Sequence, residues 1–168
     1  TSSAGMSLLT LPEPDAAVLA RRDGIIRQLK KLIAAPGLIV DREGCRTFET
    51  DALTAYRCIP LAVVLPASTE EVSRVLRFCH DTKLKVVPRG AGTSLCGGAL
   101  PLEDAIVLGI SRMSKVLAID VTNRAARVEA GVTNIANKWG LVCGWLPLER
   151  IRDLAFVPSL TYAYHFRA

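Results

Sequence analysis

The stretch between Leu61 and Val87 predicts a strand, a helix and a second strand in close succession. Residues 61–65 ("LAVVL") and 85–87 ("KVV") are short β-branched runs, which are typical of buried strands. Between them, Ser68 and Glu71 have the spacing of a capping box at the start of a helix. Apolar residues then recur at helical spacing, at Val72, Val75, Leu76 and Cys79. Two strands that are joined by one helix run parallel in a sheet, so this stretch predicts a βαβ unit.

The flanking segments extend this unit on both sides. Residues 15–35 predict a helix that begins after a capping Asp15, whereas residues 38–58 have weak periodicity and are expected to be irregular. Residues 105–110 ("AIVLGI") predict a third strand, and residues 116–132 predict a hairpin around the turn sequence "VTNR". We therefore expect an α+β fold, with a small parallel sheet flanked by helices and then the start of an antiparallel sheet. The expected core lies on Val63, Val64, Val72, Leu76, Val86 and Ile106.

A glycine-rich stretch follows the second strand directly, in "VVPRGAGTSLCGG" at residues 86–98. Glycine permits positive φ angles and lets a ligand approach the backbone, whose N–H groups bind anions. Thr93 and Ser94 add hydroxyl donors, and Arg89 adds charge or braces the stretch. We call residues 89–98 the glycine loop and expect it to bind a phosphate or pyrophosphate. A glycine-rich surface turn without a ligand is the alternative.

Two common phosphate-binding motifs fit this loop poorly. A P-loop needs a lysine after its last glycine, but Gly97 is followed by Gly98. The dinucleotide fingerprint needs a third glycine where Leu95 stands. The loop therefore predicts an anion site of another kind.

Composition and charge narrow the function classes. The chain has 168 residues, of which half are hydrophobic, so one domain with a sizeable core is expected. Its net charge of +5 is mild, and the basic residues group only between residues 21 and 31, which indicates a solvated helix face rather than nucleic-acid binding. No run has the length and purity of a membrane span, and the start lacks the pattern of a secretory signal. We expect a soluble, cytoplasmic protein.

The cysteines and histidines give no support for a metal site. The five cysteines are odd in number and lack metal-clamp spacing, which favours reduced thiols. Cys96 lies in the glycine loop, where a small filler is favoured over a redox role. His80 and His165 are the only histidines, and their spacing indicates no metal ligation.

The segment from residue 61 to residue 101 strongly resembles the flavin-binding region of the FAD-linked oxidases of the p-cresol methylhydroxylase and vanillyl-alcohol oxidase type. Its sequence is "LAVVLPASTEEVSRVLRFCHDTKLKVVPRGAGTSLCGGALP". The motifs "RTFETDALTAYR", "SRMSKVLAID" and "RVEAGVTN" agree in order and spacing, so the resemblance covers roughly residues 14–136. Within the family, the likeness is strongest to FAD-linked subunits of bacterial glycolate oxidases, with D-lactate dehydrogenases next. Asp51 and Tyr56 lie in the first of these motifs, where packing and functional roles both stay open.

The resemblance implies FAD as the cofactor. In this family the loop wraps the FAD pyrophosphate, which implies backbone donors at Gly90, Ala91, Gly92, Thr93 and Ser94, with Arg89 and Gly98 alongside. Some relatives attach FAD through a histidine in the loop, but the matching position here is Thr93. Non-covalent FAD is therefore implied.

The resemblance also implies a reaction and partners for a full-length parent. Such a parent oxidises a 2-hydroxy acid such as glycolate or lactate. It passes electrons to other subunits of the glycolate oxidase type or to a quinone, and it meets a membrane only through such subunits. The family's substrate-binding and catalytic side chains lie in a later domain, so no catalytic residue is assigned here.

Residues 137–168 do not match the family pattern. We therefore expect three parts: an N-terminal helical segment at 1–58, the first part of an FAD-binding domain at 59–136, and a divergent tail at 137–168. The tail predicts a truncated or frameshifted version of a longer subunit, and the alternative is a genuinely short protein. The rival function is a non-catalytic folded fragment without flavin, which self-associates as a homodimer through its tail.

Overall fold

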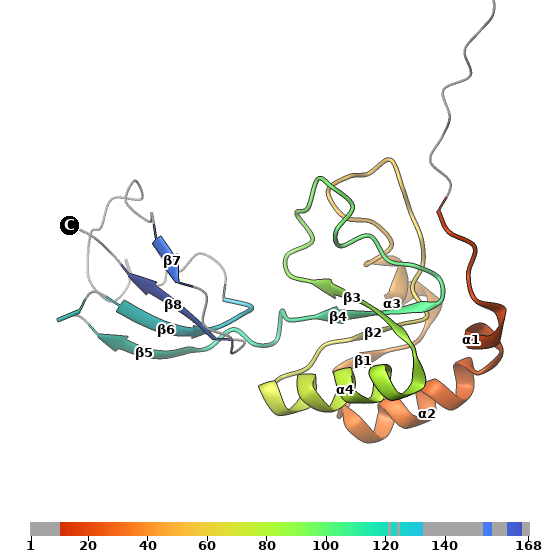
Figure 1. The fold of residues 1–168 in the computed structure, drawn as a ribbon, viewed down its shortest axis with the longest axis horizontal. Coiled ribbons are helices and arrows are strands. Elements are labelled where there is room, and N and C mark those ends of the chain that lie inside the picture. Colours follow the sequence, from red (N-terminus) through yellow and green to blue (C-terminus); the bar gives the residue numbers. More distant parts are fainter. Residues whose placement is uncertain (1–10, 121, 124, 133–152, 156–160, 166–168) are drawn as a thin grey trace, which may run out of the picture.

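The computed structural model describes residues 11–120, 122–123, 125–132, 153–155 and 161–165. Its strands form two separate four-stranded sheets, with the orders β1-β2-β4-β3 and β5-β6-β8-β7 (Figure 1). The elements are α1 Ala16–Ala20, α2 Arg22–Leu32, β1 Leu38–Ile39, α3 Arg42–Arg46, β2 Ala62–Val64, α4 Thr69–Thr82, β3 Lys85–Arg89, β4 Ala105–Gly109, β5 Val116–Asp120, β6 Ala125–Glu129, β7 Asp153–Ala155 and β8 Thr161–His165. The expected α+β class, with parallel strands followed by an antiparallel sheet, is confirmed.

The first sheet places β4 between the two strands of the predicted βαβ unit. Both β2 and β3 pair with β4 in parallel, with Val63 opposite Val107 and Val86 opposite Ile106. The predicted strands are thus parallel to each other, but they are not neighbours. The short β1 adds an antiparallel edge to β2. As a result, β3 is an edge strand of the sheet, and the chain that follows it leaves from that edge.

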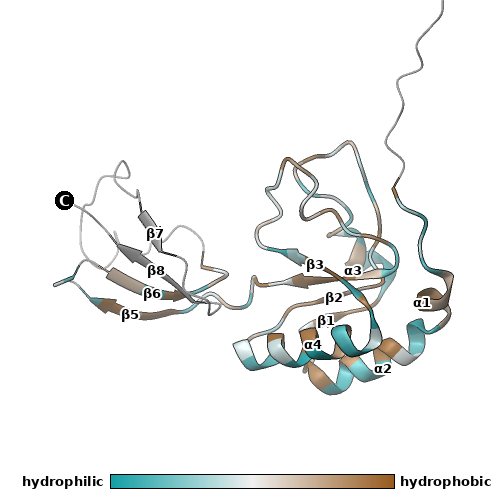
Figure 2. Ribbon diagram, in the orientation of Figure 1, coloured by the Kyte–Doolittle hydropathy of each residue, from teal (hydrophilic) through white to brown (hydrophobic). Residues whose placement is uncertain are grey.

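The core of the first sheet is formed on both of its faces. On one face, α2 and α4 pack their apolar sides against the sheet, and on the other Cys45 of α3 packs against Val63 and Val107. All residues of β4 are buried, and Figure 2 shows this strand as hydrophobic along its length. Complete burial on two faces explains why β4 has no alternating polar residues.

Two of the residues expected in the core differ from that expectation. Leu76 of α4 is 43% exposed, so its assignment to the core was wrong. It lies at the flank of the same apolar face of α4, whose buried positions are Val72, Val75 and Cys79. Val86 is half-buried, since β3 is an edge strand.

The helix ends follow the predicted caps with two differences. Asp15 accepts hydrogen bonds from Ala17 N and Val18 N, but the predicted helix is interrupted at Arg21 and forms α1 and α2. Ser68 caps α4 by accepting from Glu71 N at 3.3 Å. The Glu71 carboxylate accepts from the backbone N–H of Ala67 at 2.7 Å, one residue before the partner that a standard capping box uses.

The segment at 38–58 is more regular than expected. It contains β1 and α3, which span only two and five residues, respectively, and are too short to create a periodic pattern. The Asp41 side chain caps α3 by accepting from Gly44 N at 2.6 Å. The rest of the segment, residues 47–58, has neither helix nor strand.

The second sheet begins with the predicted hairpin. β5 and β6 pair antiparallel, with Ile119 opposite Ala126. β8 then pairs with β6, and β7 pairs with β8, so two strands from the expected tail complete the order of this sheet. In the described part of the chain, no helix is both long and apolar enough to cross a membrane.

Candidate functional site

The glycine loop begins at the carboxyl end of the edge strand β3. Arg89 is the last residue of β3, and residues 90–98 contain neither helix nor strand. In Figure 1 the loop rises beyond the end of β3, beside the chain that follows α3. Ligands of parallel sheets characteristically bind beyond the carboxyl ends of the strands, so this position suits a binding loop.

Arg89 braces the root of the loop. Its Nη1 donates to the backbone carbonyl oxygens of Thr50 at 2.7 Å and Ala99 at 3.4 Å. The guanidinium also lies over the ring of Phe48, 5.5 Å from its centroid, within the range of a cation–π contact. Of the two roles expected for Arg89, adding charge or bracing the loop, these contacts favour bracing. The side chain closes the loop from residue 89 to residue 99 and ties it to the segment after α3.

The second half of the loop is held by one hydroxyl group. Ser94 Oγ accepts from the backbone N–H groups of Cys96 and Gly98, both at 3.3 Å. Leu100 N donates to Gly97 O at 3.1 Å. The N–H of Gly98 is therefore already satisfied inside the loop, and the Ser94 hydroxyl serves as an acceptor rather than as a free donor.

The first half of the loop carries backbone donors without acceptors. Among the described residues, the N–H groups of Gly90, Ala91, Gly92 and Thr93 donate no hydrogen bond. Gly90 and Ala91 are exposed, and a Cβ atom added at Gly90 would meet no atom within 4 Å. Four consecutive N–H groups beside open space match the chemistry of an anion site.

Two glycines in the loop have backbone angles that other residues resist. Gly92 has φ +73° and Gly97 has φ +75°. A Cβ at Gly92 would also meet the Arg89 guanidinium, with its Nε 2.9 Å away, whereas one at Gly97 would meet nothing within 4 Å. Gly92 is therefore required both by its conformation and by the brace.

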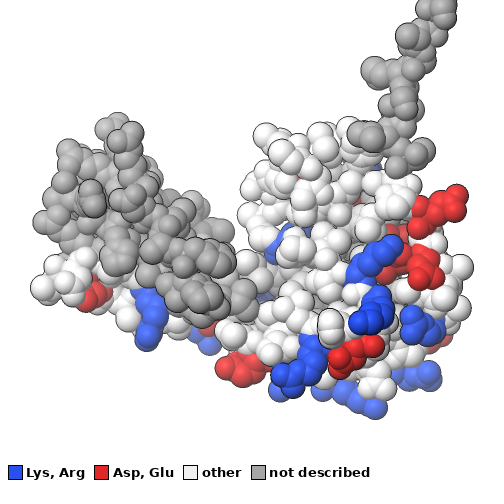
Figure 3. Space-filling model, viewed as in Figure 1, with Lys and Arg blue, Asp and Glu red and all other residues white. Residues whose placement is uncertain are grey.

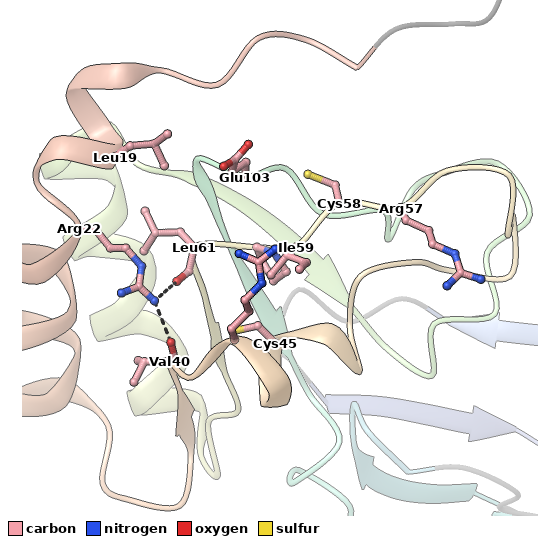
Figure 4. A pocket seen from close by; sticks show the side chains of 11 residues that line it. Leu19, Arg22, Val40, Cys45, Arg57, Cys58, Ile59, Leu61 and Glu103 are labelled. Carbon is pink, nitrogen blue, oxygen red and sulfur yellow. Dashed lines mark hydrogen bonds between the residues drawn. The ribbon is translucent and has the colours of Figure 1, made fainter.

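A concavity of the surface lies apart from the loop. It has a volume of about 560 Å³ and shares no lining residue with the loop. Figure 4 shows Arg22 in its wall, donating to the carbonyl oxygens of Val40 at 2.7 Å and Leu61 at 3.5 Å. Burial raises the pKa of the Cys45 and Cys58 thiols that line it. The internal hydrogen bonds of Arg22 indicate a structural role for its side chain.

The charges on the surface are of mixed sign. In Figure 3, Lys and Arg side chains gather over the helices, with Asp and Glu side chains among them. Within the described ranges, no group of three or more His, Cys, Asp or Glu side chains is placed to hold a metal ion. The glycine loop is the stretch in which such unpaired donors coincide with glycines and with the carboxyl end of a parallel strand.

A family model described as an FAD binding domain matches residues 60–149. This chain belongs to that family. The family's description names FAD, so the expected cofactor is confirmed, as is the resemblance on which it rested. The match runs past residue 136, and the expected domain boundaries stay predictions.

Curated relatives point to enzymes that act on 2-hydroxy acids. The glycolate oxidase subunit GlcD of Escherichia coli (strain K12) is 41% identical over 115 residues, which cover 68% of this chain and 23% of the relative. The D-lactate dehydrogenase of Archaeoglobus fulgidus is 37% identical over 118 residues, or 70% of this chain and 23% of the relative. This chain thus spans about a quarter of the length of these relatives.

Solved structures agree on the fold. p-Cresol methylhydroxylase with substrate bound has a TM-score of 0.67 at 19% identity, over 90% of this chain and 29% of the other. The 4-ethylphenol oxidase from Gulosibacter chungangensis has a TM-score of 0.65 at 26% identity, over 80% of this chain and 27% of the other. The first subdomain of a p-cresol methylhydroxylase-type fold is therefore confirmed.

Proposed function

We propose that this chain is the pyrophosphate-binding part of an FAD-dependent 2-hydroxy-acid oxidoreductase. The observation that carries this proposal is the row of four unpaired N–H groups, from Gly90 to Thr93, at the carboxyl end of β3. Membership of the FAD-binding family supplies the ligand, and the glycolate oxidase and D-lactate dehydrogenase relatives supply the substrate class.

The loop residues divide into those that bind and those that support. The backbones of Gly90, Ala91, Gly92, Thr93 and Ser94 donate to the phosphate oxygens. We assign a supporting role to Arg89 and Gly98, since Arg89 Nη1 donates to Thr50 O and the N–H of Gly98 donates to Ser94 Oγ. Several converging N–H groups hold a doubly charged pyrophosphate without a lysine, because each bond to a charged acceptor is strong.

The cofactor is held without a covalent bond. Thr93 occupies the loop position at which covalently linked relatives carry a histidine, and no histidine lies between His80 and His165. When bound, FAD would accept a hydride from the carbon that bears the substrate hydroxyl group. The residues of the glycine loop position that cofactor by its phosphates.

The partners follow from the relatives. GlcD is named as a subunit of an enzyme, so we infer that a full-length parent assembles with other subunits of the glycolate oxidase type. Electrons then leave through such a subunit or through a quinone, in the cytoplasm or at a membrane reached through the partner. Residues 137–168 do not by themselves complete the flavin site.

The test is a substitution that fills the open space without disturbing the chain. Gly90→Val meets no atom within 4 Å and needs no positive φ, so the variant should fold. It should lower the affinity for pyrophosphate and for FAD by about 10- to 100-fold, as expected when charged hydrogen bonds are lost. Isothermal titration calorimetry measures both affinities, and circular dichroism checks the fold.

Gly24→Val is the matched control, because Gly24 in α2 also has open space and an ordinary φ. It should leave both affinities unchanged. Equal affinities for the Gly90→Val variant and the control would show that the loop does not hold the phosphates.

A further inference from the structure

A chain of backbone hydrogen bonds connects the root of the glycine loop with the second sheet. Ile110 follows β4, and its N–H donates to Arg89 O at 3.1 Å. Ile110 O accepts from the N–H of Met113 at 3.0 Å, and Met113 O accepts from the N–H of Gly131 at 2.8 Å. Gly131 lies just beyond β6, which ends at Glu129. These bonds therefore lead from the loop to the end of β6, along the stretch that links the two sheets in Figure 1.

Gly131 packs against the Ile110 peptide too closely for any side chain. A Cβ atom at this position would collide with Ile110 O, and it would lie 2.8 Å from Met113 O and 3.0 Å from the carbonyl carbon of Ile110. All of these are backbone atoms, so the rotation of a side chain would not relieve the contact. Glycine is thus required here by the close approach of two stretches of backbone.

The surroundings of this contact leave the Ile110 carbonyl little room to move away. The Met113 side chain is 1% exposed and belongs to the apolar core that the first sheet forms with α2 and α4. A close-packed core resists displacement of such a side chain. Further along, Lys115 N donates to Glu129 Oε2 at 2.8 Å, and Glu129 N donates to Lys115 O at 2.9 Å. The stretch after β4 is therefore fastened both to the core and to the end of β6.

The hydrogen bond from Ile110 also sets the direction of the first donor of the anion site. Arg89 O and the Gly90 N–H belong to the same peptide group, which is planar and trans, so the two point in opposite directions. Because Ile110 N holds Arg89 O toward β4, the Gly90 N–H points away from β4. It donates no hydrogen bond among the described residues. A displacement of Ile110 would thus turn this donor.

We propose that Gly131 is a positioning residue for the anion site of the glycine loop. It touches no ligand, and it acts through the Ile110 peptide, which orients the Gly90 N–H. This inference rests on the proposed function of the loop. It couples the second sheet to phosphate binding, although the loop itself extends from the first sheet.

The test compares two variants of the full chain that place a methyl group against a backbone carbonyl. Gly131→Ala crowds Ile110 O, beside the loop root. Gly37→Ala is the matched control, because its Cβ would lie 2.7 Å from Leu65 O at the end of β2, which β4 separates from β3. Isothermal titration calorimetry gives the affinity for inorganic pyrophosphate, urea unfolding gives the stability, and NMR gives the Gly90 N–H signal without ligand.

We expect both variants to be less stable than the wild type, but only Gly131→Ala to bind pyrophosphate more weakly, by about 3- to 10-fold. Its Gly90 N–H signal should be shifted before any ligand is added, whereas that of Gly37→Ala should stay in place. An unchanged affinity in Gly131→Ala, or an equal loss in both variants, would overturn the inference. A loss of affinity without a shift of the Gly90 signal would contradict the route through Ile110.

Hydrogen exchange of the wild-type chain decides the question if Gly131→Ala does not fold. Coupling between two places is reciprocal, so bound pyrophosphate should slow exchange of the N–H groups of Ile110 and Gly131. The slowing should exceed that of Leu65 N–H, which donates to Gly37 O at 2.6 Å. Equal slowing at all three would overturn the inference alone. A wild-type chain that does not bind pyrophosphate would overturn the proposed function and this inference with it.

Discussion

The two halves of the glycine loop differ in how their backbone groups are satisfied. From Ser94 to Gly98, one hydroxyl group collects two N–H donors and fixes the chain. From Gly90 to Thr93, no N–H group has an acceptor among the described residues. The N–H groups of Ser94, Leu95 and Gly97 also have no acceptor there. The loop therefore has one internally bonded end, at Cys96 and Gly98, and a longer run of donors that stays available to a ligand.

Removal of the Arg89 brace should have the largest effect on this arrangement. Arg89→Gln loses the bond to Thr50 O and the contact with Phe48, and should cost about 2–3 kcal/mol of unfolding free energy in urea. Because Arg89 ties the start of the loop to Thr50 O and to Ala99 O, its loss should also lower the affinity for pyrophosphate. Arg57→Gln is the control: Arg57 forms an exposed ion pair with Glu49 and should cost less than about 1 kcal/mol. An equal loss of unfolding free energy in Arg89→Gln and Arg57→Gln would mean that Arg89 does not brace the loop.

Asp104 tests the opposite end of β3. Its buried carboxylate accepts from Lys85 Nζ at 2.6 Å and from Asp15 N at 2.9 Å. Asp104→Asn should cost about 2 kcal/mol in unfolding free energy, yet leave pyrophosphate affinity unchanged, because the loop leaves β3 at its other end. A loss of affinity would show that the loop depends on the whole strand.

The contribution of Asp104 should also depend on pH. Burial alone raises the pKa of its carboxyl group, but the hydrogen bonds from Lys85 and Asp15 outweigh burial and lower the pKa. A lowered folded-state pKa gives stability that is present above the ordinary pKa of an aspartate and is lost as the pH falls through the folded value. Urea unfolding at a series of pH values should show the difference between wild type and Asp104→Asn shrinking in that acidic range. A constant difference would contradict the lowered pKa.

The two glycines with positive φ separate the halves further. Gly92→Ala should cost about 1–2 kcal/mol and weaken pyrophosphate binding, because the new Cβ meets the Arg89 guanidinium. Gly97→Ala meets nothing within 4 Å and should cost about 1 kcal/mol from its φ angle alone. Its binding should change little. Equal loss of binding in both variants would remove the distinction between the halves.

Ser94→Ala should have the smallest effect. Its two N–H partners are exposed to water in the loop, so the loss should be about 0.5–1 kcal/mol or less in unfolding free energy. Pyrophosphate affinity should fall by less than about fivefold, since the open half keeps its donors. A complete loss of binding would place the main donors in the second half.

Much of the first sheet could be predicted from local patterns. The strands at 61–65 and 85–87 are marked by β-branched residues, and α4 is long enough to show both a cap at Ser68 and helical periodicity. The insertion of β4 between β2 and β3 could not be predicted, because strand order depends on contacts between distant segments. The exposure of Leu76 was missed for a related reason: helical spacing defines an apolar face but not how far the neighbouring layer covers it.

The position of the candidate site could be predicted from the sequence, but the separate roles of its residues could not. Composition located the glycine loop and left Arg89 with two roles, which its contacts with Thr50 O and Phe48 separate. The use of the Ser94 hydroxyl as an internal acceptor left no sequence signal.

The most direct measurement is an NMR titration of the labelled chain that follows each backbone N–H as pyrophosphate is added. The N–H signals of Gly90, Ala91, Gly92 and Thr93 should shift most and saturate together. Those of Cys96 and Gly98, which already donate to Ser94 Oγ, should shift less. Shifts that are absent from residues 90–93, or that are larger at Cys96 and Gly98, would contradict the account.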